Sequence, residues 1–236
     1  MKIMLVRVGA DQSVGGGSWN GPVDSQSREF AYVAIPEHSA VHTGLEKPYA
    51  EIEPVLHRFG VSLPGHLETA PMHLDPDFSH LTYGDAGTRG RQIRATLKPG
   101  DMALFYAGLR DVRGASRLVY ALIGLLVVEE LVSAIDVREA DRDINAHSRR
   151  VLDPAATDVI VRGRAGVSGR LQRCLPIGEY RDRAYRLTKD IMDEWGGLSN
   201  KDGYLQRSGS LPRLLDPSRF IRWLDRQEPN LTQANN

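Results

Sequence analysis

The segment VGADQSVGGGSWNGPVD combines an acid, three consecutive glycines, an indole and an amide. Glycine allows close approach of the backbone to a ligand, which makes Gly16 and Gly17 candidate substrate-binding positions. Asp11 could supply a catalytic carboxylate, Trp19 could stack on a nucleobase, and Asn20 could bind the base or position water. The segment has neither the lysine of a P-loop nor the glycine spacing of a dinucleotide-binding turn. We therefore expect a base-sized pocket here, with a flexible hairpin as the alternative.

A second candidate segment is HLDPDFSHLTYGDAG. His73 and Asp75, together with the distant His147, would match the two-histidine, one-carboxylate ligand set of iron oxygenases. Segments of this composition are more often loops in which aspartates cap turns, so we expect neither a metal nor a cofactor. Asp77 is a second candidate for the catalytic carboxylate, and Tyr83 is a second candidate for stacking on a base.

Arginine is concentrated in one part of the chain. Residues 149–189 contain ten Lys or Arg and four Asp or Glu, a local net charge of +6 (10 − 4), whereas the whole chain has a net charge of +0. Arginine suits bidentate contact with phosphates and base edges. We expect His147 to hold a flipped base, and Arg149, Arg150 and Arg207 to contact DNA phosphates. The alternative is a solvated surface on which the arginines pair with local acids.

Strands and turns must position these residues. Apolar runs predict strands over 2–8, 29–37, 97–111 and 116–131, and helical spacing predicts a helix over 48–59. An apolar stripe at 184–195 and an N-cap at Asp216 predict helices near the carboxyl end, and the polar tail from Glu228 is expected to fray.

These elements indicate a single α+β domain over 1–236. Residues 1–135 form its β-rich part with the candidate pocket, and residues 136–236 its mainly helical, basic part. The core is expected to be a mixed β-sheet or a PUA/EVE-like barrel.

The location of the protein is indicated by features that the chain lacks. Its one cysteine, Cys174, excludes internal disulfides and a thiolate zinc cage. The longest apolar stretch, 118–128, is too short to span a membrane, and the first ten residues do not match a signal peptide. We expect a soluble cytoplasmic protein with no membrane partner; the sequence leaves its oligomeric state open.

Several motifs together resemble the third nucleotide-modification-associated domain family. GADQSVGGGSWNGPVD, YVAIPE, HLDPDF, YGDAG and LKPGDMALFYAGLR…YALIGLLVVEE occur in the family's order, most clearly over residues 1–130. The family's opening loop typically has two glycines followed by Ser-Pro, whereas this chain has a third glycine and then Trp19-Asn20-Gly21-Pro22 after Ser18. The family is linked to hypermodified DNA in phages and in bacteria that resist them. The segment LKPGDMALFY…LIGLLVV also resembles barrel domains of the PUA and EVE type, which read modified bases.

The resemblance implies a DNA glycosylase of antiphage defence that excises a bulky modified pyrimidine, such as glucosylated hydroxymethylcytosine, from double-stranded DNA. Such an enzyme flips the base and cleaves the N-glycosidic bond through an oxocarbenium-like transition state, which Asp11 or Asp77 could stabilise. None of the five lysines lies in a setting that would depress its pKa, so we expect a monofunctional enzyme that leaves an abasic site. The alternatives are a non-catalytic PUA/EVE-like reader of modified DNA and an iron-dependent base hydroxylase.

Overall fold

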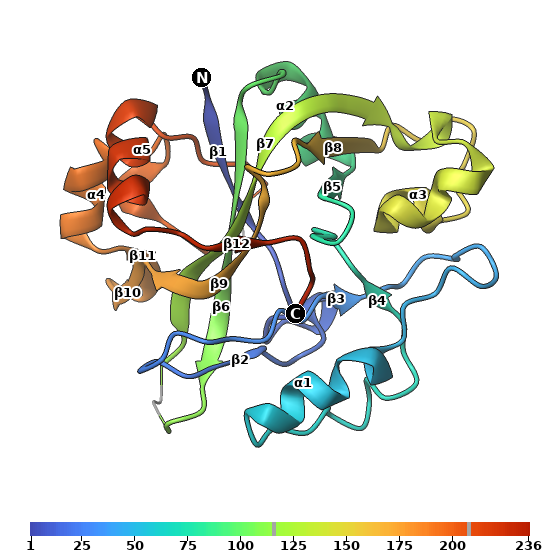
Figure 1. The fold of residues 1–236 in the computed structure, drawn as a ribbon, viewed down its shortest axis with the longest axis horizontal. Coiled ribbons are helices and arrows are strands. Elements are labelled where there is room, and N and C mark those ends of the chain that lie inside the picture. Colours follow the sequence, from blue (N-terminus) through green and yellow to red (C-terminus); the bar gives the residue numbers. More distant parts are fainter. Residues whose placement is uncertain (115–116, 207–208) are drawn as a thin grey trace.

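The computed structural model describes residues 1–114, 117–206 and 209–236. Its centre is a mixed sheet whose central strands are the apolar segments of the sequence (Figure 1). β1 (Ile3–Arg7) runs parallel to β6 (Met102–Asp111), and β6 pairs antiparallel with β7 (Val119–Ser133). The predictions of strands over 2–8 and 97–111 are therefore confirmed, as is the strand over the described part of 116–131, whereas of the strand predicted over 29–37 only Ile35–Pro36 forms.

The long strand β7 changes partner along its length. Its first half pairs with β9 (Gly169–Pro176) and its second half with β8 (Val159–Gly163). β5 (Thr82–Asp85) pairs with the other edge of β8, which gives the strand order β1-β6-β7-β8-β5. No pairing among the described residues joins β5 back to β1, so the sheet does not close. The mixed sheet is confirmed, and the PUA/EVE-like barrel is not.

Short elements surround this sheet. Two strands extend it, β2 (Pro22–Val23) along β6 and β12 (Leu231–Thr232) along β9. Two further pairs stand apart from it, formed by β3 (Ile35–Pro36) with β4 (Met72–His73) and by β10 (Gly178–Arg181) with β11 (Ala184–Leu187). The helices are α1 (Glu53–Arg58), α2 (Gly87–Thr96), α3 (Ala146–Arg149), α4 (Lys189–Trp195) and α5 (Pro217–Arg226).

Two apolar clusters form the core, one on each face of the sheet. Because side chains alternate along a strand, Met4 and Val6 of β1 join one cluster and Ile3 and Leu5 join the other. The second cluster is closed by α4 and α5, which lie together at one side of the sheet, while α3 lies at the opposite side (Figure 1). The candidate site lies on the side of α3.

The prediction that residues 136–236 are mainly helical is not confirmed by the structure. Four strands, β8 to β11, lie between residues 159 and 187, and the stripe predicted over 184–195 is divided between β11 and α4. The division occurs at Thr188, whose side chain accepts a hydrogen bond from the Ile191 amide and begins α4 there. The helix over 48–59 is confirmed as a 3-10 turn that continues into α1.

The carboxyl-terminal tail is ordered rather than frayed. β12 pairs with β9, and the Asn235 side chain accepts a hydrogen bond from the Phe78 amide at 2.7 Å. The Asn236 side chain accepts from the Tyr32 amide at 2.7 Å and donates to its carbonyl at 3.0 Å. A polar tail therefore docks here by side-chain amides that pair with free backbone groups. Within the described part of the chain, every helix is too short or too polar to cross a membrane.

Candidate functional site

A cavity of about 260 Å³ lies between the end of β1, the β3–β4 pair, β5 and α3. Its wall is assembled from segments that are far apart in the sequence. The residues that line it are Arg7, Val8, Gly9, Asp11, Ile35, His73, Asp75, Tyr83, Gly84, Asp85, Ala86, Arg89, His147 and Arg150. Nine of these 14 positions carry a side chain with a polar or charged group and two more are glycine, so the cavity is suited to a polar ligand.

His73, Asp75 and His147 meet on one side of this cavity. β4 ends at His73, Asp75 follows two residues later, and α3 supplies His147. All three are buried, and one potential ligand atom from each lies within 4.8 Å of the others. The Nε2 atoms of His73 and His147 lie 3.9 and 3.8 Å from Asp75 Oδ2, which is beyond hydrogen-bond distance.

Each imidazole is held from behind by a carboxylate. His73 Nδ1 lies 2.6 Å from Glu37 Oε2, and His147 Nδ1 lies 2.5 Å from Asp158 Oδ1. Burial lowers the pKa of His73 to about 4, so this ring is neutral near pH 7. In a neutral ring an Nδ1–H that donates to a carboxylate leaves the Nε2 lone pair free, and here that atom is directed at Asp75. This carboxylate–histidine arrangement is typical of metal-binding histidines.

Asp75 is fixed by two donors on its own side of the cavity. Its Oδ1 accepts hydrogen bonds from the Gly84 amide at 2.8 Å and from Asn145 Nδ2 at 2.9 Å. Asn145 is also the N-cap of α3, since its side chain accepts from the His147 amide at 2.9 Å. One amide side chain thus couples the position of His147 to that of Asp75. Burial raises the pKa of Asp75 to about 7.

α3 lies so close to β5 that position 84 must be a glycine. A Cβ atom at this position would lie 2.3 Å from His147 Cδ2 and 2.6 Å from Asn145 Oδ1. Both distances are far below ordinary contact, so only glycine lets the imidazole lie against the strand. The same residue donates its amide to Asp75, and it therefore positions two of the three side chains.

Three arginines add positive charge to the cavity wall. Arg7 pairs with Asp11 at 3.4 Å and Arg89 pairs with Asp85 at 3.0 Å. Arg150 binds both carboxylate oxygens of Glu37, at 3.0 and 2.9 Å. Arginine guanidinium groups are suited to binding phosphate. An arginine whose acidic partner occupies one side of the guanidinium keeps its other N–H groups available to a ligand.

The glycine-rich loop makes room for the carboxylate of Asp11. Asp11 Oδ1 accepts hydrogen bonds from the backbone amide of Ser13, at 2.9 Å, and from its hydroxyl. A Cβ atom at Gly16 would lie 1.9 Å from the same oxygen. Gly16 and Gly17 are absent from the residues that line the cavity, whereas Asp11 lines it. Gly16 therefore shapes the wall through Asp11, and neither glycine faces the cavity.

Trp19 and Asn20 lie behind the loop, away from the cavity lining. Trp19 packs against the apolar core, and its amide donates to the Asp11 carbonyl at 3.0 Å. Asn20 is buried, and its side chain donates to the Gly108 carbonyl of β6 at 2.7 Å. Both residues anchor the loop to the sheet. Tyr83 does line the cavity, where its hydroxyl donates to Asp85 Oδ2 at 2.5 Å and accepts from Arg89 at 2.9 Å.

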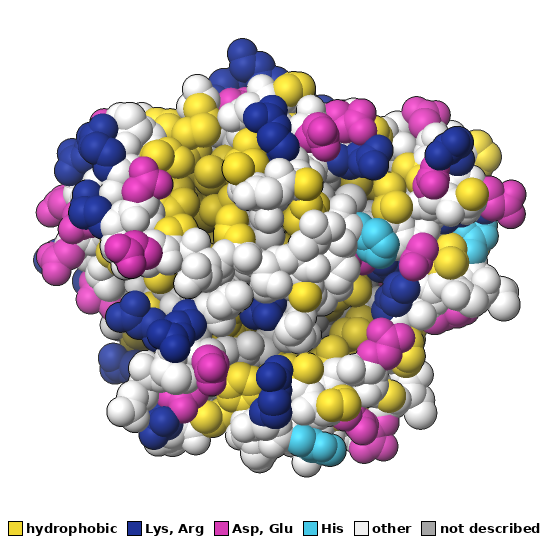
Figure 2. Space-filling view, in the orientation of Figure 1, with side chains coloured by type: hydrophobic (Ala, Val, Ile, Leu, Met, Phe, Trp, Pro, Cys, Tyr) yellow, Lys and Arg dark blue, Asp and Glu magenta, His cyan; other side chains and the backbone are white. Residues whose placement is uncertain are grey.

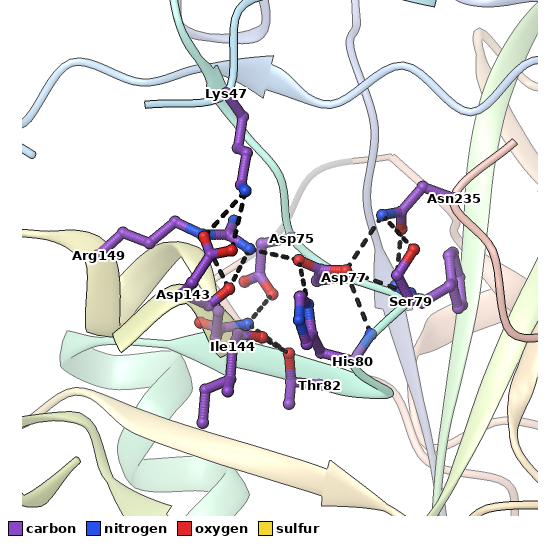
Figure 3. A network of polar contacts seen from close by, with 12 residues as sticks. Lys47, Asp75, Asp77, Ser79, His80, Thr82, Asp143, Ile144, Arg149 and Asn235 are labelled. Carbon is purple, nitrogen blue, oxygen red and sulfur yellow. Dashed lines mark hydrogen bonds and ion pairs between the residues drawn. The ribbon is translucent and has the colours of Figure 1, made fainter. Parts of the chain in front are cut away.

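Asp77 and Arg149 belong to a buried polar network beside the cavity, which Figure 3 shows together with Asp75. Arg149 Nη2 donates to Asp77 Oδ2 at 2.5 Å, and Arg149 Nε donates to Asp143 at 2.9 Å. Asp77 also binds His80 and Asn235, at 3.1 Å each. Arg149 is 2% exposed and Asp77 1%, so neither presents a free face to a substrate or to DNA.

Of the other arginines of the basic segment, four are paired with acids or buried, and Arg164, Arg173 and Arg183 are exposed. Arg162 binds Glu130, Arg181 binds Asp202, and Arg170 is buried with its guanidinium over the Phe30 ring. Figure 2 shows positive and negative side chains interspersed on the visible face. The local charge of +6 is thus distributed rather than gathered at the cavity, where Arg150 is its only member among the described lining residues. Arg207 lies outside the described residues.

Sequence reasoning missed the residues that support the cavity. Glu37 and Gly84 lie in the motifs YVAIPE and YGDAG, which do not indicate what these residues support, and Glu37, Gly84, Asn145 and Asp158 reach the site from four different segments. The proline-terminated run before Glu37 is the one local signal, because it indicates a strand end at which a polar side chain could face a pocket.

A family model described as nucleotide modification associated domain 3 matches residues 2–213. The match contains every described residue of the cavity wall, and it confirms the resemblance seen in the sequence motifs. No curated protein and no solved structure shows a significant match. The chain belongs to the nucleotide modification associated domain 3 family, which suggests a role in the processing of modified nucleotides.

Proposed function

We propose that the protein is an enzyme that acts on a modified nucleotide of DNA, with its active site in the cavity beside His73, Asp75 and His147. The observation that supports this most is the convergence of buried ionisable side chains from separate segments in one cavity. Burying such groups is unfavourable for folding, and clusters of them in a cavity are typical of functional sites.

The size and charge of the cavity favour a single nucleotide. A volume of about 260 Å³ lies just below the range of pockets that take drug-sized ligands, which suits a nucleobase with a substituent. The wall offers Arg7, Arg89 and Arg150 to the adjoining phosphates. Since the target atoms of a base are covered inside a duplex, the nucleotide would have to be flipped into the cavity.

The reaction that we propose is hydrolysis of the N-glycosidic bond of a bulky modified pyrimidine. Water adds to C1′ of the sugar, and the base departs with a proton, leaving an abasic site. Asp11 is the carboxylate that would stabilise the oxocarbenium-like transition state, because it lines the cavity and is oriented by Ser13 and Arg7. Asp77 is not proposed for this role, because its oxygens are bound to Arg149, His80 and Asn235.

The substrate and the biological setting rest on the sequence motifs. Glucosylated hydroxymethylcytosine in phage DNA is the proposed base, and antiphage defence in the cytoplasm is the proposed role. No lysine is among the described residues that line the cavity, which supports a monofunctional reaction without a Schiff base.

The test uses DNA duplexes that carry cytosine, hydroxymethylcytosine or its glucosylated form at one position. Mass spectrometry detects the released base, and mild alkali converts each abasic site into a strand break. Asp11→Asn should lower the rate about 10²–10⁴-fold and keep DNA binding, whereas Asp225→Asn on the exposed face of α5 should match the wild type. Unchanged turnover in Asp11→Asn would assign the carboxylate role elsewhere, and failure to release any base would refute the glycosylase.

A second candidate function, an iron-dependent base hydroxylase, is favoured by the two-histidine, one-carboxylate set itself. The same duplexes distinguish it, since an oxidised base retained in the strand would form only with Fe²⁺, oxygen and a two-electron reductant, which leaves the second oxygen atom as water. DNA binding without any change of the base would instead support a reader, although the barrel on which that alternative was based is not present in the described residues.

A further inference from the structure

We propose that His73 Nε2, His147 Nε2 and the Asp75 carboxylate bind a divalent first-row transition metal ion at the wall of the cavity. Metal bonds of about 2.0–2.2 Å place neighbouring ligand atoms roughly 3–3.5 Å apart. The two Nε2 atoms lie 3.9 and 3.8 Å from Asp75 Oδ2, and all three ligand atoms lie within 4.8 Å of one another, so an inward movement of these side chains would bring them to coordination distance.

The carboxylates that bind the Nδ1 atoms of the two histidines are an independent observation in favour of this metal site. Glu37 and Asp158 each bind an Nδ1 atom, which directs both Nε2 atoms toward the same carboxylate. The distances from both Nε2 atoms to Asp75 are longer than a hydrogen bond, and the three potential ligand atoms converge on one point at the cavity wall.

Acidic side chains outnumber cationic ones immediately around this point. Glu37, Asp75 and Asp158 are carboxyl groups, and Arg150 is the cationic partner of Glu37. A divalent ion would be favoured beside such a group of carboxylates.

The donor set determines the class of ion. Two imidazoles and one carboxylate suit Zn²⁺, Fe²⁺ or Mn²⁺, whereas Mg²⁺ and Ca²⁺ prefer oxygen ligands alone. Three protein ligands leave at least one coordination position open, and the three side chains line the cavity, so water or substrate could occupy it. If the proposed hydrolysis is correct, the ion would lower the pKa of a bound water and supply the nucleophile. That role rests on the proposed function, but the site itself does not.

The test is metal binding by the full chain, without a histidine tag and without DNA. Chelator-stripped protein is titrated calorimetrically with Zn²⁺, Mn²⁺, Fe²⁺ under anaerobic conditions, and Mg²⁺, and bound metal is counted by elemental analysis. We expect one ion per chain, with Zn²⁺ bound more tightly than Fe²⁺ and Fe²⁺ more tightly than Mn²⁺, and no saturable Mg²⁺ binding.

Variants separate this site from adventitious binding. His73→Ala and His147→Ala should abolish stoichiometric Zn²⁺ binding, and Glu37→Gln and Asp158→Asn should weaken it about 10–100-fold. His57→Ala, which removes an exposed histidine of α1, should bind like the wild type. Zinc should also raise the melting temperature of the wild type but not that of His147→Ala. A cooperative thermal transition of His147→Ala without zinc would show that this variant is folded.

Absence of stoichiometric Zn²⁺, Fe²⁺ and Mn²⁺ binding, or wild-type affinity in both histidine variants, would overturn the proposal. Because no substrate is present, this result is independent of whether the protein releases a base. A protein that binds zinc but releases no base would keep the metal site and refute only the glycosylase.

Discussion

Replacing Gly84 by alanine should displace His147 and weaken metal binding without removing a ligand or a hydrogen-bonding group. The alanine retains the backbone amide that donates to Asp75, so the effect would be steric. The added Cβ would lie 2.3 Å from His147 Cδ2, whereas ordinary contact begins at 3.4 Å. The ring or the strand must therefore retreat by about 1.1 Å (3.4 − 2.3).

That displacement is large compared with what a metal site tolerates. Metal–ligand distances in proteins stay within about 0.2 Å of their usual values, so a shift of about 1 Å removes His147 from the coordination sphere or strains it severely. We expect zinc affinity to fall by about 10–100-fold or more, because a loss of that size is typical when a residue that supports a metal ligand is disturbed. Crowding of the packed interior should also lower the free energy of unfolding by about 1–3 kcal/mol.

The measurement is zinc affinity by calorimetry, together with urea unfolding. Gly65→Ala is the matched control, because a Cβ there meets its nearest atom, Glu68 Oε1, at 3.9 Å. A double-mutant cycle in the free energy of unfolding adds His147→Ala: if the new Cβ clashes with the His147 ring, Gly84→Ala should lower stability less in the His147→Ala background than in the wild type. Wild-type zinc affinity in a folded Gly84→Ala protein would refute the reasoning.

Three further predictions follow from burial and pairing. Arg149→Ala should lower the free energy of unfolding by about 3–5 kcal/mol in urea, because it leaves Asp77 buried without its arginine, while Arg162→Ala at an exposed pair should change it by less than about 1 kcal/mol; equal stabilities would contradict this. Arg150→Ala should reduce the salt dependence of DNA binding by roughly one unit if Arg150 contacts a phosphate, and an unchanged slope would confine it to its pair with Glu37. Burial raises the pKa of the Cys174 thiol to about 12, so a thiol reagent at pH 8 should modify it only after unfolding, and rapid labelling of the native protein would show that it is accessible.

The sequence predicted the strands at the centre of the fold because their signals are local. The apolar runs of β1, β6 and β7 are buried on both faces, and glycine or proline turns limit them. The error over the last third has the same origin. Apolar spacing over 184–195 fits a helix, but pairing of β11 with β10 and the N-cap at Thr188 override it.

The residues of HLDPDF show where local reasoning ends. His73, Asp75 and Asp77 alternate along one segment, and alternation alone predicts that they share a face. In the structure the segment bends back after Asp75, since Asp77 pairs with Thr82 and turns toward Arg149. Although Asp75 and Asp77 are only two positions apart, Asp75 therefore lines the cavity, whereas Asp77 is buried in the interior.

The sequence by itself determined the chemical types at the site, the strand that leads to Asp11, and the possibility that two histidines and an aspartate form a ligand set. Only the tertiary structure decided that this set assembles, because His147 is 72 residues from Asp75 and the carboxylates behind the rings come from two further segments. The direction of a side chain depends on what packs against its backbone. At this site those partners are distant in sequence, so neither spacing nor composition could specify them.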